Sequence, residues 1–294
     1  MDKVEVKYVP AFTPSWLSIR QLENVESVRE IIRQFVHEEA SNQVDNQWCE
    51  VRTLNKEVIY KRHKHMHINK NSIRARFIDL SHTIEDGLVT YKGLPAPIIC
   101  DYLSREQSRS RYDAGTEFQI GKIEMVANTG TYIDFPFHRY EDGKDLSQVE
   151  IECFTDLEGI VIRADHKKAL AIDACFFEGK EIRGKAVLVH TGWDANWNTA
   201  RYFDDHPYLT EDAAIYLEKC GVKLVGIDSM NIDHTKKGSR PVHSILLKSE
   251  ILIVEHLCNL NDLPDEGFSF SAIPPKFKGV GTFPVRALAK LSGQ

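Results

Sequence analysis

Residues 128–138 read NTGTYIDFPFH and follow an apolar run at 121–127. This short segment carries an amide, a hydroxyl, a phenol, a carboxylate and an imidazole, on Asn128, Thr131, Tyr132, Asp134 and His138. Gly130 frees the backbone and Pro136 removes a hydrogen-bond donor, so we expect a rigid loop that does not continue a sheet. Rigid loops at strand ends often carry binding and catalytic groups. The alternative is an ordinary turn, because Asn, Gly, Asp and Pro all favour turns.

The composition excludes several classes of protein. The 294 residues are 42% hydrophobic and 27% charged, which is typical of a globular chain with a sizeable core. The 37 basic and 43 acidic residues give a net charge of −6, so we expect no nucleic-acid partner. No apolar run is long enough to cross a bilayer, and the first residues, MDKVEVKY, are charged where a signal peptide is apolar. We therefore predict a cytoplasmic protein that has no membrane partner.

The six cysteines are widely spread and include no CxxC pair. This distribution favours reduced, buried thiols over a disulfide framework or a cysteine-rich zinc site.

Residues 1–75 are predicted to form an extension with a structure of its own. Residues 25–39 carry apolar side chains at helical spacing, and residues 49–54 and 57–68 are typical of two strands joined as a hairpin. We expect this helix and hairpin to pack on the rest of the chain or on a partner subunit. His63, His65 and His67 fall on one face of the second strand, and the surrounding lysines and arginines favour a solvated basic edge over a metal site.

Residues 76–294 have the pattern of an α/β domain. A helix is predicted at 213–219, with an N-cap in Thr210-Glu211-Asp212 and Gly221 as its end. Strand, helix and strand in this order indicate an α/β body. The strand-like segments are 121–127, 159–163, 185–191, 223–228 and 251–257.

Two further groups are candidate partners of the 128–138 segment. His243 lies in PVHSILL, and Glu255 ends the apolar run ILIV. A carboxylate that ends such a run needs a metal, a cation or a proton as its partner. Two carboxylates and an imidazole suit a divalent ion such as zinc or manganese.

Several motifs in order resemble the cyclase-like metal-dependent hydrolases, which include kynurenine formamidase and isatin hydrolase. The resemblance covers about 77–291, and its carriers are FIDLSHTIEDGL, TGTYIDFPFH, VLVHTGW, GIDS, PVHSILL and IVEHL. It implies a swivelling β/β/α domain with a mixed sheet and flanking helices. It also implies a homo-oligomer, a dimer or a tetramer.

The sequence departs from the family's motif, His-x-Gly-Thr-His-x-Asp-x-Pro-x-His, at two metal-ligand histidines. Asn128 and Tyr132 stand at these positions, whereas Asp134 and His138 match the motif, and His243 and Glu255 match at the family's spacing. A neutral amide oxygen is a poor zinc ligand, and a phenol with a pKa of ~10 stays protonated. The resemblance therefore implies that half of a binuclear site is missing.

We predict that one divalent ion, zinc or manganese, is held by Asp134, His243 and Glu255. Such an ion lowers the pKa of water toward ~7. His138 would act as general base and then as acid, and Tyr132 and Asn128 would donate hydrogen bonds to the oxyanion. The alternative is a metal-free cluster in which Asp134, His138 and Glu255 are joined by hydrogen bonds.

Aromatic residues near these motifs are candidates for the substrate pocket. They suit a flat or apolar substrate, and the alternative for each of them is packing in the core. The four candidates are Phe135, Phe137, Trp193 and Trp197.

We predict an arylformamidase-like hydrolase that cleaves a C–N or C–O bond next to a carbonyl in a small molecule. The substrate would be a formamide, a cyclic amide or a lactone. One alternative is a metal-free dehydratase, lyase or isomerase that uses Tyr132 and His138 as its acid/base pair. Another is a catalytically silent binding or assembly protein.

Overall fold

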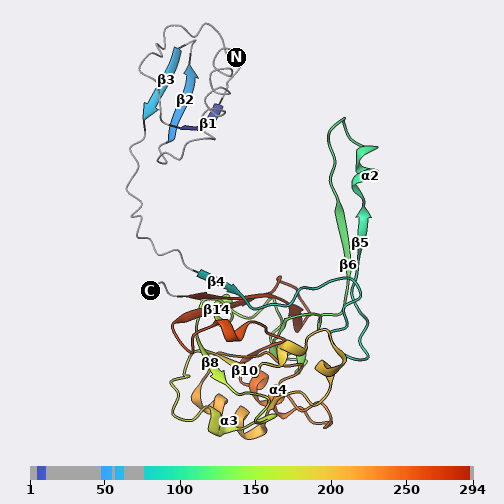
Figure 1. The fold of residues 1–294 in the computed structure, drawn as a ribbon, viewed down its shortest axis with the longest axis vertical. Helices are drawn as coiled ribbons and strands as arrows, with labels where there is room; N and C mark the ends of the chain where they lie inside the picture. Colours follow the sequence, from blue (N-terminus) through green and yellow to red (C-terminus); the bar gives the residue numbers. More distant parts are fainter. Residues whose placement is uncertain (1–4, 11–47, 55–56, 63–75, 292–294) are drawn as a thin grey trace. The chain divides into compact units, whose positions relative to one another are not determined.

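Apolar runs separated by turn residues form a nine-stranded mixed sheet in the computed structural model (Figure 1). The structure describes residues 5–10, 48–54, 57–62 and 76–291. The order across the sheet is β15-β7-β13-β12-β10-β8-β14-β16-β4. The bounds are β4 Arg76–Asp79, β7 Tyr132–Asp134, β8 Leu157–Arg163, β10 Ala186–His190, β12 Leu224–Ile227, β13 Leu252–Glu255, β14 Phe268–Ile273, β15 Thr282–Pro284 and β16 Arg286–Leu291.

The centre of the sheet is parallel and its flanks are antiparallel. Strands β8, β10, β12 and β13 run parallel to one another, and β7, β14, β15, β16 and β4 add antiparallel pairs. Successive residues of β10 enter different clusters, with Leu188 in one core and Val187 and Val189 in the other. The parallel strands are therefore apolar on both faces, as strands covered on both sides must be. The predicted mixed α/β sheet is confirmed.

Two helices pack against one face of this sheet. Helix α3 (Glu211–Cys220) ends at Gly221, whose φ of 71° suits a residue without a Cβ. Helix α4 (Pro241–Lys248) begins with a proline, which lacks the N–H that a first turn leaves unpaired. Both helices bury side chains among the residues of the Val187 cluster. Among the described residues, none of the helices combines the length and the apolar character needed to span a membrane.

Short strands and 3-10 helices lie between the larger elements of residues 76–291. A two-stranded pair, β9 (Ala171–Ile172) and β11 (Tyr208–Leu209), runs parallel. The remaining turns form short 3-10 helices, which are η2 Pro136–His138, η3 Ile151–Cys153, η4 Ala174–Phe176, η5 Trp193–Asn196, η6 Ala200–Phe203 and η7 Leu260–Asp262.

A hairpin arm extends from the sheet (Figure 1). Strands β5 (Ile98–Leu103) and β6 (Ile120–Glu124) pair antiparallel, with helix α2 (Arg105–Arg109) between them. The apolar run at 121–127 was predicted to be a strand that leads into the 128–138 segment. The strand instead ends at Glu124 and is exposed, because β5 is its partner and neither strand joins the nine-stranded sheet.

The prediction that 128–138 is a loop outside the sheet is wrong at its centre. Residues 132–134 form β7, which pairs antiparallel with both β13 and β15. The turn residues flank this strand instead of replacing it. Gly130 adopts a φ of 67° in contact with Ile84 before the strand, and Pro136 opens a 3-10 helix after it.

The chain divides into the units Met1–Ser72 and Ile73–Gln294. In the first unit, β1 (Glu5–Pro10), β2 (Trp48–Leu54) and β3 (Glu57–Arg62) form an antiparallel sheet. The helix predicted at 25–39 and the three histidines at 63, 65 and 67 lie outside the described residues. The predicted domain boundary, subunit contacts and homo-oligomer stay predictions.

Candidate active site

Three neighbouring strands bring the predicted site residues together. Tyr132 lies opposite Glu255 in the pairing of β7 with β13, and Asp134 lies opposite Thr282 in the pairing of β7 with β15. Because side chains alternate along a strand, Tyr132 and Asp134 face one side and Ile133 the other. Ile133 enters the core, while Asp134 and Glu255 are fully buried beneath α4. Two carboxylates that lie 121 positions apart in the sequence thus meet on one face of the sheet.

His243 is held in place by Asp233, which sequence reasoning missed. One Asp233 oxygen accepts from the backbone N–H of Val242 at 2.9 Å, and the other accepts from the N–H of His243 at 3.0 Å. The second oxygen also lies 2.6 Å from His243 Nδ1. Asp233 therefore caps helix α4 and fixes the imidazole so that Nε2 faces the two buried carboxylates. This arrangement is typical of a metal-ligating histidine.

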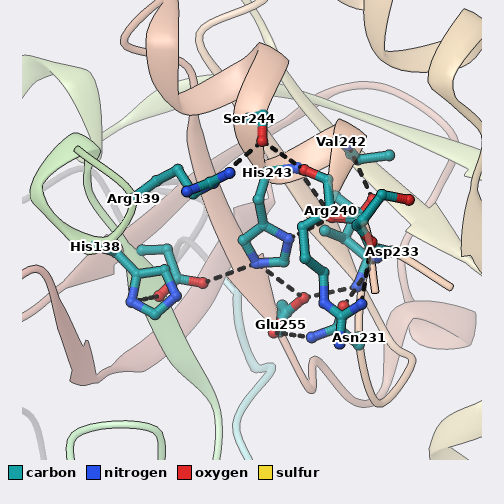
Figure 2. A network of polar contacts seen from close by, with 12 residues as sticks. His138, Arg139, Asn231, Asp233, Arg240, Val242, His243, Ser244 and Glu255 are labelled. Atoms are coloured by element: carbon teal, nitrogen blue, oxygen red, sulfur yellow. Dashed lines mark hydrogen bonds and ion pairs between the residues drawn. The ribbon is translucent and has the colours of Figure 1, made fainter. Parts of the chain in front are cut away.

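The His243 imidazole lies between the carboxylates of Asp134 and Glu255, the second of which is labelled in Figure 2. His243 Nε2 is 3.6 Å from Asp134 Oδ2 and 3.7 Å from Glu255 Oε1. These distances are too long for hydrogen bonds. They are close to the separation of about 3.3 Å between ligand atoms of a tetrahedral zinc site. Asp134 Oδ2 is buried and accepts no hydrogen bond, so a cation would satisfy it.

The electrostatics of the site also favour a cation. Burial lowers the pKa of His243, but its interactions with Asp134, Asp233 and Glu255 prevail and raise that pKa to about 10. Burial raises the pKa of Glu255 to about 7. The buried carboxylates thus hold a positive charge at His243 Nε2, and a divalent ion can take the place of that proton.

Thr282 connects His138 to Asp134. The Thr282 hydroxyl donates to Asp134 Oδ1, and its oxygen lies 2.8 Å from His138 Nδ1. Since the hydroxyl has a single proton, we assign Nδ1 of His138 as the donor to Thr282. His138 Nε2 then carries the free lone pair. Sequence reasoning missed Thr282, because it lies 144 residues from His138 and outside the recognised motifs.

His138 also offers a ligand atom to the same site. One ligand atom each from Asp134, His138 and His243 lies within 4.8 Å of the others. Glu255 Oε1 lies 3.7 Å from His243 Nε2, so His138, through its free Nε2, and Glu255 are both candidates for the third ligand beside Asp134 and His243.

Tyr132 and Asn128 border a cavity above these groups. The Tyr132 hydroxyl donates to Glu255 Oε2 at 2.5 Å, and burial raises the pKa of this phenol well above its usual value. The phenol therefore stays protonated, and its hydroxyl is already engaged as a hydrogen-bond donor to Glu255. The cavity is about 350 Å³ and is lined by Tyr91, Lys92, Gly93, Leu94, Asn128, Tyr132, His138, Arg139, Asn231, Arg240 and His243.

Comparison with known proteins identifies the family of the chain. The family model described as "Putative cyclase" matches residues 78–234. The chain belongs to the Cyclase family. Kynurenine formamidase of Bacillus anthracis is 28% identical over 74% of this chain and 98% of that protein. The enzyme of the same name from Geobacillus thermodenitrificans is 27% identical, over 74% of this chain and 98% of its own length.

Solved structures show the same Cyclase fold. Isatin hydrolase A from Labrenzia aggregata superposes with a TM-score of 0.64 and 22% identity, over 74% of this chain and 94% of that one. A structure described as a potential metal-dependent hydrolase with cyclase activity gives a TM-score of 0.59 and 25% identity, over 75% and 100% of the two chains.

The four aromatic residues that were predicted to line the substrate pocket do not line the cavity beside His138 and His243. Phe135 is fully buried against Phe154, because it alternates with Asp134 and so points into the opposite core. Trp193 is buried and its indole donates to the carbonyl of Tyr202 at 3.0 Å. Trp197 stacks on His82 with ring centroids 4.0 Å apart, and Phe137 is half-buried. Phe135 and Trp193 match the alternative of core packing, Trp197 packs partly buried against the cluster of Trp193, and Phe137 belongs to neither a core cluster nor the cavity lining.

Proposed function

We propose that this Cyclase-family chain hydrolyses a C–N or C–O bond next to a carbonyl in a small molecule. A formamide or cyclic amide is the first candidate, and a lactone the second. One observation carries the proposal. His243 Nε2 stands 3.6 and 3.7 Å from two buried carboxylate oxygens, one of which, Asp134 Oδ2, has no hydrogen-bond partner. The kynurenine formamidases among the relatives support an amide substrate.

Asp134, His243 and Glu255 would hold the divalent ion. An imidazole with two carboxylates suits zinc or manganese. When bound, the ion polarises the carbonyl group and makes water a stronger acid. Glu255 is oriented for this task by the N–H of Ile232 at 2.6 Å and by the Tyr132 hydroxyl at 2.5 Å.

His138 is the proposed proton carrier. Its Nδ1 donates to Thr282, whose hydroxyl donates to Asp134, so Nε2 is free to accept a proton from the attacking water. The imidazole then carries that proton to the departing nitrogen or oxygen. The side chain is one third exposed and lines the cavity, which gives it access to a substrate.

The two proposed oxyanion donors, Asn128 and Tyr132, differ in whether another residue already accepts their hydrogen bonds. Asn128 lines the cavity and can donate through its amide nitrogen, which also lies within reach of the Tyr132 hydroxyl. Tyr132 would first have to release Glu255. We therefore propose Asn128 as the principal donor and Tyr132 as the residue that positions Glu255.

Metal content and turnover, measured together, test the proposal. The protein is purified without a metal-chelating tag, its ion content is determined by elemental mass spectrometry, and hydrolysis of formanilide, isatin and an aryl lactone is assayed. We expect close to one zinc or manganese per chain, with turnover that a chelator removes and the ion restores. Asp134→Asn is expected to lose both, and the exposed Asp262→Asn serves as the matched control.

Other outcomes would overturn the proposal. Turnover that survives chelation would favour the metal-free acid/base enzyme. Absence of both ion and turnover after supplementation with zinc and manganese would favour a silent binding protein.

A further inference from the structure

Two arginine side chains line the cavity together with His138 and His243. Arg139 follows His138 directly, and Arg240 precedes the first turn of helix α4. Figure 2 shows the two side chains on either side of His243. Neither was anticipated from the sequence, where isolated arginines carry no signal of a site.

Neither guanidinium group pairs with a carboxylate among the described side chains. Arg139 Nε donates to the hydroxyl of Ser244 at 3.1 Å. Arg240 Nη1 donates to the carbonyl oxygens of Lys237 and Ser239, at 2.6 and 3.1 Å. Both terminal nitrogens of Arg139, and Nη2 of Arg240, keep donors that these contacts do not use. Lys92 on the cavity wall differs, because it lies 3.5 Å from Asp204.

The two arginines are tied to one framework. The Ser244 hydroxyl accepts from Arg139 and donates to the backbone carbonyl of Arg240 at 2.7 Å. The Arg139 guanidinium also lies over the ring of Tyr140, 5.8 Å from its centroid. Ser244 follows His243 in helix α4, so it links the Arg139 side chain and the Arg240 backbone to the helix that carries His243. Side chains positioned in advance lose less entropy when they bind a ligand.

The charges of the cavity leave these two cations without compensation. The buried carboxylates of Asp134, Asp233 and Glu255 all lie within 3.7 Å of the His243 imidazole, and none of them contacts either arginine. Arg139 and Arg240 are therefore cations of the cavity wall that have no carboxylate partner among the described side chains. A planar guanidinium binds a carboxylate through paired hydrogen bonds.

We infer that Arg139 and Arg240 bind a carboxylate group of the substrate, so that the substrate is an anionic amide, formamide or lactone. The type of bond that is cleaved is taken from the proposed function. The carboxylate subsite is inferred from the two arginines alone. A cavity of about 350 Å³ is at the lower end of the range for small-molecule sites, which fits a compact substrate.

Equilibrium binding tests the subsite without any turnover. Calorimetric titration with benzoate and with benzamide is carried out in the presence of EDTA, so that the carboxylate cannot bind a metal. We expect wild-type protein to bind benzoate at least about tenfold more tightly than benzamide. Arg139→Gln and Arg240→Gln are each expected to reduce benzoate affinity by about tenfold or more and to leave benzamide affinity within about twofold. The exposed Arg183→Gln is the matched control.

A kinetic comparison tests the same residues in turnover. We expect 2-formamidobenzoate to be hydrolysed with a higher kcat/KM than formanilide, and the two arginine variants to remove most of that preference through KM. Equal binding of benzoate and benzamide by wild-type protein, or unchanged benzoate affinity in both variants, would overturn the inference. Arginine-dependent benzoate binding without hydrolysis of any substrate would keep the subsite and overturn the proposed function. Hydrolysis with the same kcat/KM in wild type and in both arginine variants would keep the proposed function and overturn the carboxylate subsite.

Discussion

Thr282 Oγ1 lies 2.8 Å from His138 Nδ1 and donates its own proton to Asp134. A single hydroxyl therefore links the proposed proton carrier to a proposed metal ligand. It also fixes the tautomer of the imidazole, because the hydroxyl cannot donate to both partners.

Replacing Thr282 by valine keeps the shape and removes this link. We expect kcat of Thr282→Val to fall about 10- to 100-fold, because His138 loses its fixed tautomer and Asp134 its donor. The KM should change little, since Thr282 does not line the cavity. Thr282→Ser, which restores the hydroxyl, should recover most of kcat. Steady-state kinetics of both variants make the comparison, and a valine variant as fast as wild type would contradict the proposed relay.

Asp233 should control metal affinity without being a ligand. In Asp233→Asn the amide can no longer accept from both Val242 and His243 and still orient Nδ1 of the imidazole. We expect zinc affinity to fall about 10- to 100-fold. Competition with a chromophoric chelator measures this affinity, and circular dichroism checks the fold. Asp262→Asn is the control, and equal affinities of the two variants would count against the role of Asp233.

Tyr132→Phe separates a metal hydrolase from a metal-free acid/base enzyme. The phenylalanine variant loses the hydrogen bond to Glu255. If Tyr132 positions a metal ligand, excess zinc or manganese should restore most of the lost activity. An essential acid would cost about 10²- to 10⁴-fold in rate, and added metal would not recover it. Activity as a function of metal concentration decides between the two.

His82 should make the fold sensitive to acid. Burial lowers the pKa of His82 to about 4, so the unfolded chain binds more protons than the folded one between pH 4 and 6.5. The contribution of His82 to stability is therefore present above pH 6.5 and is lost as the pH falls toward 4. The loss is on the order of 2–3 kcal/mol.

The difference between wild type and His82→Phe measures this contribution. A phenyl ring can keep the stacking on Trp197 and does not titrate. Asp228 acts in the opposite direction, because burial raises its pKa to about 7 and its charge destabilises the fold as the pH rises. Only the difference in unfolding free energy, obtained with urea at several pH values, isolates His82. If the unfolding free energies of wild type and His82→Phe change with pH in parallel, His82 does not contribute to the acid sensitivity of the fold.

The sequence by itself determined the parts of the fold that depend on local pattern. Apolar runs marked the parallel strands β8, β10, β12 and β13, because strands buried on both faces are almost continuously apolar. The turn residues around Gly221 marked the end of α3. The resemblance of the motifs that carry Asp134, His138, His243 and Glu255 implied a single site, and these residues do lie close together in the structure.

Only the tertiary structure decided which residues complete that site. Thr282 lies 148 residues from Asp134, and β15 brings them together because it pairs with β7. No local pattern records such a pairing, since the order of strands in a sheet is a property of the whole chain. Because β7 pairs with β15, residues 132–134 form a strand, and the alternation of side chains along it points Phe135 toward the core. Arg139 and Arg240 line the same cavity for a similar reason, because helix α4 packs on the part of the sheet where β7 and β13 lie side by side.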